Sequence, residues 1–163
     1  MGDYMIKKEN WKTYAFWIVL SEAVGILSGL LSRQGMMNFG KTAQQPPLSP
    51  PAILFPIVWT ILYALMGISA ARISLAVPSP DRNRGLNLFI AQLIVNFFWS
   101  LIFFNTGAYG FSLLWLLLLW GLVLWMILTL RKVDPLAALL QIPYLLWLTF
   151  AAYLNYGVWM LNR

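Results

Sequence analysis

The residues of this sequence that could do chemistry are amides and aromatic rings inside long apolar stretches. The stretch QLIVNFFWSLIFF places Gln92, Asn96, Trp99 and Phe103 at helical spacing, so they share one helix face. A buried amide is costly unless it finds a hydrogen-bond partner. Two interpretations stay open for this face: amides that join neighbouring helices, or a polar anchor in an aromatic pocket.

Two further stretches carry large aromatic residues at the same spacing. One face of FPIVWTILYALMG holds Trp59 and Tyr63, and one face of IPYLLWLTFAAYLN holds Trp147, Ala151 and Leu154. Such stripes are more often packing than a ligand site. Interfacial belts explain tryptophan near helix ends, whereas these tryptophans stand within their stretches.

The common reagents of catalysis are missing. The sequence has no Cys and no His, which excludes thiolate and imidazole chemistry, the usual zinc sites and the usual haem ligands. We therefore expect no cofactor and no ordinary acid–base catalysis. Glu22 is the one acid deep in an apolar stretch, VLSEAVGILSGLL. It is either a structural carboxyl or the carboxylate of a small-molecule transporter. Gly25 and Gly29 form a GxxxG motif that favours close helix approach.

Composition places the chain in a membrane. Of its 163 residues, 61% are hydrophobic and 10% are charged, whereas soluble domains have about 25% charged residues. No charge occurs between Arg84 and Arg131. We predict one all-α domain, residues 1–163, built as a five-transmembrane-helix bundle with spans at about 14–33, 52–77, 86–105, 109–130 and 136–160.

Basic residues predict the orientation of this multi-pass protein in the cell membrane. One face carries eight: Lys7, Lys8, Lys12, Arg72, Arg82, Arg84, Arg131 and Lys132. The other face carries three: Arg33, Lys41 and Arg163. The positive-inside rule then puts the N-terminus in the cytoplasm and the C-terminus outside. The net charge of +6 is explained by topology, so we expect no nucleic-acid partner.

Prolines stiffen the connection before the second span. The connection from Gln34 to Pro51 is expected to be the longest loop, and its end carries Pro46, Pro47, Pro50 and Pro51. Proline fixes φ and pushes the preceding residue to an extended conformation. We interpret this segment either as a well-made helix start or as the rigid edge of a lid over a cavity.

The last two spans are expected to differ in role. The fourth has no internal polar residue except Ser112 and Thr129, and its three tryptophans point in different directions. We therefore interpret it as mainly lipid-facing scaffold. Pro143 lies inside the fifth span and predicts a kink there.

Three of these motifs together resemble a known family. PPLSPPAILFPIVWTILYALMGISA, QLIVNFFWSLIFF and PYLLWLTFAAYLN, in this order, are similar to the tryptophan-rich sensory protein and translocator protein family (TspO/MBR, peripheral benzodiazepine receptor-like). The resemblance covers about residues 25–162. Leu48 and Ile53 depart from it, since many members have tryptophan there. Arg163 stands one position too far from Tyr156 for the family's cholesterol motif, so we predict no sterol specificity.

The resemblance implies a five-helix bundle, often a homodimer, with one cavity under the first loop. Such a cavity binds porphyrins and benzodiazepine- or isoquinoline-type ligands. Carried over by motif, the ligand-binding residues are Trp59, Asn96, Trp99, Phe103, Trp147, Ala151 and Leu154. Tyr63 is added to them because it shares the helix face of Trp59.

We weigh three functions. The first is binding, transport or sensing of a tetrapyrrole such as protoporphyrin IX, with Arg33 and Lys41 near the mouth to meet its carboxylates. The second is light-dependent porphyrin breakdown that uses Trp59 and Trp147, which the resemblance to some bacterial members suggests. The third is transport that uses Glu22. Enzymatic activity is the less favoured interpretation.

Overall fold

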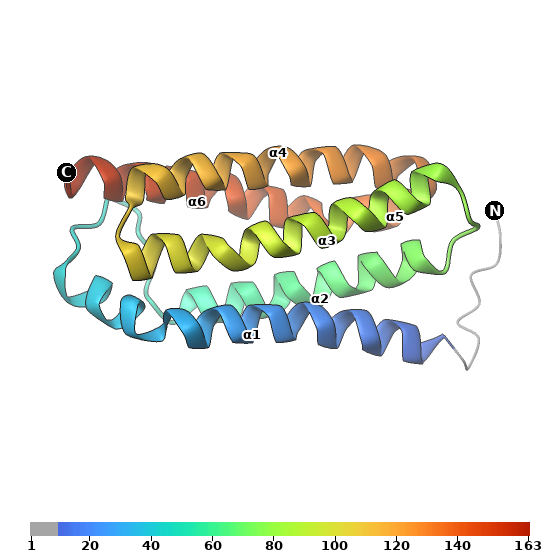
Figure 1. Cartoon of the computed structure of the whole chain (residues 1–163), viewed down its shortest axis with the longest axis horizontal. Helices are drawn as coiled ribbons and strands as arrows, with labels where there is room; N and C mark the ends of the chain where they lie inside the picture. The colour runs from blue at the N-terminus through green and yellow to red at the C-terminus, as the bar shows by residue number, and fades with distance from the viewer. Residues whose placement is uncertain (1–9) are drawn as a thin grey trace.

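The computed structural model describes residues 10–163 as an elongated helical bundle (Figure 1). No strand occurs in this part of the chain. Five segments are long and apolar enough to cross a membrane: Trp11–Thr42, Leu54–Ser74, Pro80–Asn105, Tyr109–Val133 and Pro135–Leu161. The all-α membrane bundle that the sequence predicts is confirmed.

The five spans are built from six α-helices and one π-helical turn. They are α1 (Trp11–Thr42), α2 (Leu54–Ser74), α3 (Pro80–Ser100), the turn η1 (Leu101–Asn105), α4 (Tyr109–Val133), α5 (Pro135–Leu139) and α6 (Ile142–Leu161). In Figure 1, α1 and α2 run along one side, α4 and α6 along the other, and α3 lies between them. The packing agrees, since α2 packs mainly on α1, and α4 packs on both α3 and α6.

Two helices begin at a cap that can be read from the sequence. The Ser79 hydroxyl accepts a hydrogen bond from the Arg82 N–H at 3.1 Å, and Pro80 follows as the first residue of α3. The Asp134 carboxylate accepts from the Leu136 N–H at 3.0 Å, and Pro135 opens α5. Both pairs combine an N-cap side chain with a proline, whose missing N–H costs nothing in the first turn.

The first helix is longer than predicted. α1 continues through the segment expected to be loop and ends at Thr42, so the connection to α2 is residues 43–53 rather than 34–51. The reason is packing: Gly35 lies against the Phe104 carbonyl, and Phe39 contacts the rings of Phe103 and Tyr109. With 32 residues, α1 is about 48 Å long, which exceeds the hydrocarbon thickness of about 30 Å.

The fourth helix is not mainly lipid-facing scaffold, and this expectation was wrong. One face of α4 is buried from Ser112 to Leu130 and supplies a large part of the core. Two of its tryptophans donate hydrogen bonds to neighbouring helices, Trp115 to the Val95 carbonyl at 2.7 Å and Trp120 to Thr149 at 2.9 Å. Only the third, Trp125, is exposed. A uniformly apolar helix gives no periodic signal for which face is buried.

The fifth span is interrupted where a kink was predicted. α5 ends at Leu139 and α6 starts at Ile142, so Pro143 lies in the first turn of a new helix rather than inside an old one. Ser69 of α2 donates to the Ala137 carbonyl at 2.8 Å and thereby joins α5 to α2.

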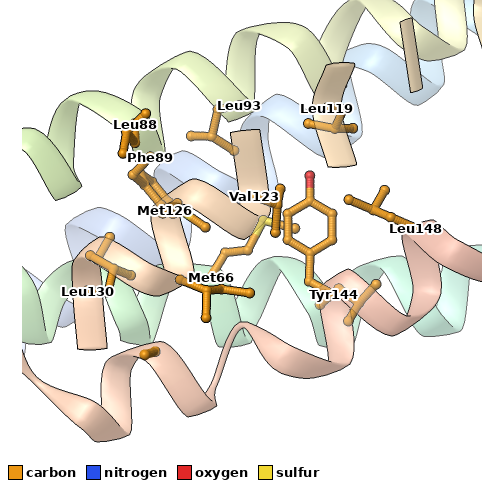
Figure 2. Packing of buried hydrophobic residues seen from close by; sticks show 14 of the residues in the cluster. Met66, Leu88, Phe89, Leu93, Leu119, Val123, Met126, Leu130, Tyr144 and Leu148 are labelled. Carbon is orange, nitrogen blue, oxygen red and sulfur yellow. The ribbon is translucent and has the colours of Figure 1, made fainter. Parts of the chain in front are cut away.

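The core lies among α2, α3, α4 and α6. Figure 2 shows Met66 and Tyr144 reaching inward from α2 and α6 to meet Val123 and Leu119 of α4. All four side chains are almost completely buried. This packing fixes the helices that carry the polar and aromatic residues described next.

Candidate ligand-binding site

An aromatic cluster in the first half of α2 is built around Trp59. Its ring centroid lies 5.5 Å from that of Tyr63 and 6.1 Å from that of Tyr144 of α6. Trp59 is half-buried, whereas the other two rings are fully packed. Aromatic pairs at these separations add stabilisation beyond the buried area. The predicted residues Trp59 and Tyr63 are thus neighbours, and Tyr144 joins them from α6.

A set of hydrogen bonds lies directly behind this cluster. The Asn96 amide donates to the Tyr63 hydroxyl at 3.1 Å, and the Tyr144 hydroxyl donates to the Gln92 carbonyl oxygen at 2.8 Å. The Gln92 amide approaches the sulfur of Met66 at 3.9 Å. The two amides of α3 therefore join neighbouring helices, and each fixes one tyrosine ring of the aromatic cluster.

Trp99 and Phe103 form a second layer, nearer the C-terminal end of α3. Their rings stack with centroids 5.0 Å apart. The Trp99 indole N–H donates to Asn155 of α6 at 3.2 Å, and the same oxygen accepts from Ser112 at 3.1 Å. The Asn155 amide donates to the Tyr109 carbonyl at 2.8 Å. The side chains of this layer thus contact one another and form their hydrogen bonds within the layer.

An open apolar cavity lies between α2 and α6. Its volume is about 420 Å³. Eight side chains line it, four from each helix: Val58, Ile61, Leu62, Leu65, Pro143, Leu146, Trp147 and Phe150. Ile61 and Leu146 are exposed on the outer surface of the bundle. The lining is therefore apolar, and the cavity opens at this outer surface.

Trp147 is the one predicted ligand-binding residue among those eight. Its ring contacts Phe55 at 5.8 Å and Phe150 at 5.6 Å. One turn further along α6, Ala151 is buried, and Leu154 beyond it is half-buried. The structure therefore separates the predicted residues into the Trp59 cluster, the Trp99 layer and the cavity wall at Trp147.

The proline-rich connection is docked on α6. The Gln44 N–H donates to the Asn162 side chain at 2.9 Å, and the Asn162 amide donates back to the Gln44 carbonyl at 2.8 Å. The Tyr153 hydroxyl donates to the Pro47 carbonyl at 2.7 Å. Pro46 packs where Gly157 has no side chain, since an added Cβ there would overlap its ring. The segment is thus held across the C-terminal end of α6.

Leu48 occupies a strained position in this docked segment. Its φ is 68° and its side chain is 80% exposed. The turn is closed by the Ser49 N–H and the Pro46 carbonyl at 3.4 Å. A proline followed by a residue with positive φ is typical of a type II turn.

The predicted charged residues lie away from this cavity. Arg33 and Lys41 are exposed on α1, and neither lines the cavity between α2 and α6. Glu22 is half-buried on α1, one turn before Gly25. The Gly25 backbone lies against the Tyr63 ring, whereas a Cβ at Gly29 would meet nothing, so only half of the GxxxG motif is used for close packing.

Sequence reasoning missed two residues that matter for this arrangement. Asn155 follows Ala151 by four residues, so helical spacing could have placed it on the inward face. Phe55 gave no signal, because an aromatic residue at the start of a span is equally typical of an interfacial belt. Among residues 10–163, no cluster of His, Cys, Asp or Glu could hold a metal ion.

Comparison with known proteins decides the family. The model of the TspO/MBR family matches residues 17–160. The chain belongs to the TspO/MBR family. It is 41% identical over 150 residues to the protein CrtK of Rhodobacter capsulatus, covering 91% of this chain and 92% of that protein. It is 35% identical over 156 residues to the tryptophan-rich protein TspO of Chlorobaculum tepidum, covering 92% and 96%.

An animal member of the TspO/MBR family is similar over the same length. The translocator protein of Bos taurus is 32% identical over 155 residues, covering 94% of this chain and 92% of that protein. The family-model match over residues 17–160 includes all three motifs that carried the resemblance. Membership in this family and the five apolar helices together make the chain a multi-pass membrane protein.

Proposed function

We propose that this protein binds flat, largely apolar ligands of the tetrapyrrole class, represented by protoporphyrin IX, in a receptor or transport role. The observation that carries the proposal is the apolar cavity of about 420 Å³ between α2 and α6, with Trp147 in its wall. Ligand pockets are mostly apolar clefts of about 300–1,000 Å³ with a few polar groups nearby. Benzodiazepine- and isoquinoline-type molecules share this flat apolar chemistry.

The chemistry of the walls suits an aromatic ligand. Trp147 and Phe150 offer ring faces, and stacking adds about 0.5–1.5 kcal/mol beyond the buried area. The Trp59 ring extends the aromatic surface toward Tyr144, which lies one turn before Leu148 on α6. Because the opening faces lipid, a ligand dissolved in the bilayer would reach the cavity without crossing water. Relatives named translocator protein support a role in handling such molecules.

A titration of the purified protein in detergent with protoporphyrin IX tests the proposal, with tryptophan fluorescence as the readout. We expect saturable quenching in the wild type. Val58→Phe fills the cavity and should weaken binding by about tenfold or more, or at least about 1.4 kcal/mol, because the added ring takes space that the ligand needs. Val19→Phe makes the same change on the exposed surface of α1 and should leave binding unchanged.

Two further variants separate binding from partition into the micelle. Trp147→Phe should reduce both the affinity and the depth of quenching, whereas Trp125→Phe, at an exposed position on α4, should reduce neither. Linear quenching without saturation in every variant would show that the porphyrin only dissolves in detergent, and would overturn the proposal.

The carboxylates of the porphyrin give a second test. Arg33 and Lys41 are exposed on α1, so they would meet only propionate groups that project out of the cavity. If they do, the double variant Arg33→Ala/Lys41→Ala should weaken protoporphyrin IX and leave its dimethyl ester unchanged. Equal affinity of this variant and the wild type for protoporphyrin IX would remove both residues from the site.

The contacts of Trp59 favour light-dependent breakdown as the second candidate. Trp59 touches two tyrosines, so a radical formed on its ring would have oxidisable neighbours. In that case the porphyrin absorption band should decay under light in the wild type. Trp59→Phe and Trp147→Phe should slow this decay. Decay at an unchanged rate in both variants would refute a role for these tryptophans.

A further inference from the structure

Gln141 has a polar side chain that the described part of the protein leaves unpaired. It lies in the interruption between α5 and α6 and is 0% exposed. Neither its amide nitrogen nor its amide oxygen has a hydrogen-bond partner among residues 10–163. A buried polar group left unpaired is costly, and buried polar groups are almost always satisfied.

Two buried hydroxyls, one on α2 and one on α6, donate their protons to partners other than Gln141. The Ser69 hydroxyl donates to the Ala137 carbonyl at 2.8 Å, and the Tyr144 hydroxyl donates to Gln92 at 2.8 Å. Gln141 precedes Tyr144 by three residues and has helical dihedral angles, φ −91° and ψ −9°. Its side chain therefore lies on the same inward face, about one turn before Tyr144.

The interrupted backbone offers a further acceptor. Across the interruption, the hydrogen bonds within the described chain run from the Gln141 N–H to the Ala138 carbonyl at 3.1 Å and from the Leu145 N–H to the Gln141 carbonyl at 3.2 Å. Pro143 has no N–H, so the Leu139 carbonyl lacks the donor that a continuous helix would supply four residues later. An unpaired amide and a carbonyl without its helical donor are thus close in sequence and share one interruption.

We propose that Gln141 binds an internal water molecule at the interruption between α5 and α6. Water can accept from the amide nitrogen and donate to the amide oxygen or to the Leu139 carbonyl. A buried water makes about three hydrogen bonds of this kind. The ligand cavity is lined by Leu65 and Pro143 but not by Gln141, so an apolar ligand there would leave this amide unpaired. The hydration site is therefore distinct from the ligand cavity.

The bound water stabilises the interruption between the two helices. α5 is fixed by Ser69 and by the N-cap of Asp134, whereas α6 carries Tyr144 and Trp147. With this water bound, α6 can start at Ile142 without leaving the Gln141 amide unpaired in the core. This inference does not depend on which ligand the cavity binds.

Water-edited solid-state NMR on the full chain in lipid bilayers tests the site. The protein is labelled with ¹⁵N at its glutamine side chains, and magnetisation transfer from water protons to each amide is measured. Gln92 is the matched control, because it is equally buried but has Tyr144 and Met66 as partners. Gln34 is exposed and serves as the positive control.

We expect a water cross-peak for Gln141 and for Gln34, and none for Gln92. Gln141→Met keeps the length of the side chain, removes both polar atoms and should abolish the Gln141 signal alone. If that variant does not fold, sequential backbone correlations in the wild type assign the same resonance. Gln141 without a water cross-peak, like Gln92, would overturn the proposal.

Discussion

Tyr63 and Tyr144 each connect a buried amide to the aromatic cluster. Asn96 donates to one hydroxyl, and Gln92 accepts from the other. In a bilayer core these amides have no water with which to form hydrogen bonds. The tyrosine hydroxyls supply the hydrogen bonds instead, and the same bonds fix the positions of the two rings. The position of the Trp59 ring therefore depends on residues of α3 that do not touch it.

Gly25 allows the Tyr63 ring to stand where it does. A Cβ at position 25 would overlap this ring, whereas position 29 on the same helix is open. We predict that Gly25→Ala displaces Tyr63 and destabilises the protein by about 1–3 kcal/mol, the usual cost of overpacking.

Gly29→Ala is the matched control for this prediction. It makes the same change in the same helix without a contact, and should be neutral or stabilise by up to about 1 kcal/mol through helix propensity. Thermal unfolding in detergent, followed by circular dichroism, measures both variants. Equal melting temperatures for the two would show that the Tyr63 ring is not held against α1.

At the scale of elements, the connection between α1 and α2 behaves as a strap fixed to α6. The reciprocal pair of Gln44 and Asn162 and the bond from Tyr153 to Pro47 hold it at two places. Prolines stiffen the chain between these places, so little entropy is lost when it docks. The proline-rich segment is thus a strap with a defined docking surface on α6.

Removing Asn162 should release one end of this strap. We predict that Asn162→Ala raises the hydrogen-exchange rate of the Gln44 amide, whose N–H now donates to the Asn162 side chain. The loss of both bonds is worth about 1–3 kcal/mol, or roughly a tenfold to hundredfold change in local opening.

Asn38→Ala provides the comparison for the strap. Asn38 lies near the end of α1, and its side chain accepts only from Gln34 in the described structure. Exchange at Gln44 should stay at the wild-type rate in this variant. An Asn162→Ala protein with wild-type exchange at Gln44 would mean that the strap is held by Tyr153 and Pro46 alone.

For the whole molecule, apolar runs predicted the fold, because each span must bury its backbone in lipid and a helix is the way to do so. The sequence did not show where α1 ends. Gln34–Thr42 has no proline and can be helix or loop, and its contact with Phe103 and Phe104 decides between them. Tertiary contacts of this kind leave no local signal.

The candidate site could be predicted only in part for a related reason. Asn96 and Trp59 were recognisable because amides and interior tryptophans are rare in a span. The packing of the helices decides where a space is left between them. The cavity lies between α2 and α6 because α6 packs on α4 rather than on α2. Trp99 and Phe103 instead fill their own layer, which helical spacing could not distinguish from a cavity wall.

Orientation in the membrane is the remaining prediction, and it concerns the whole chain. The end of the bundle that carries the α2–α3 connection has most of the basic residues, and there Arg72 pairs with Asp134 at 2.7 Å. The opposite end carries the strap. By the positive-inside rule the first end faces the cytoplasm and the strap lies outside.

Single cysteines can test this orientation directly, because the sequence contains no Cys of its own. Gln45 in the strap and Asn83 near the start of α3 are both exposed. A membrane-impermeant maleimide should label Gln45→Cys in intact cells, and should label Asn83→Cys only after the membrane is opened. Labelling of Asn83→Cys alone in intact cells would invert the topology and place the strap, together with Arg33 and Lys41, on the cytoplasmic side.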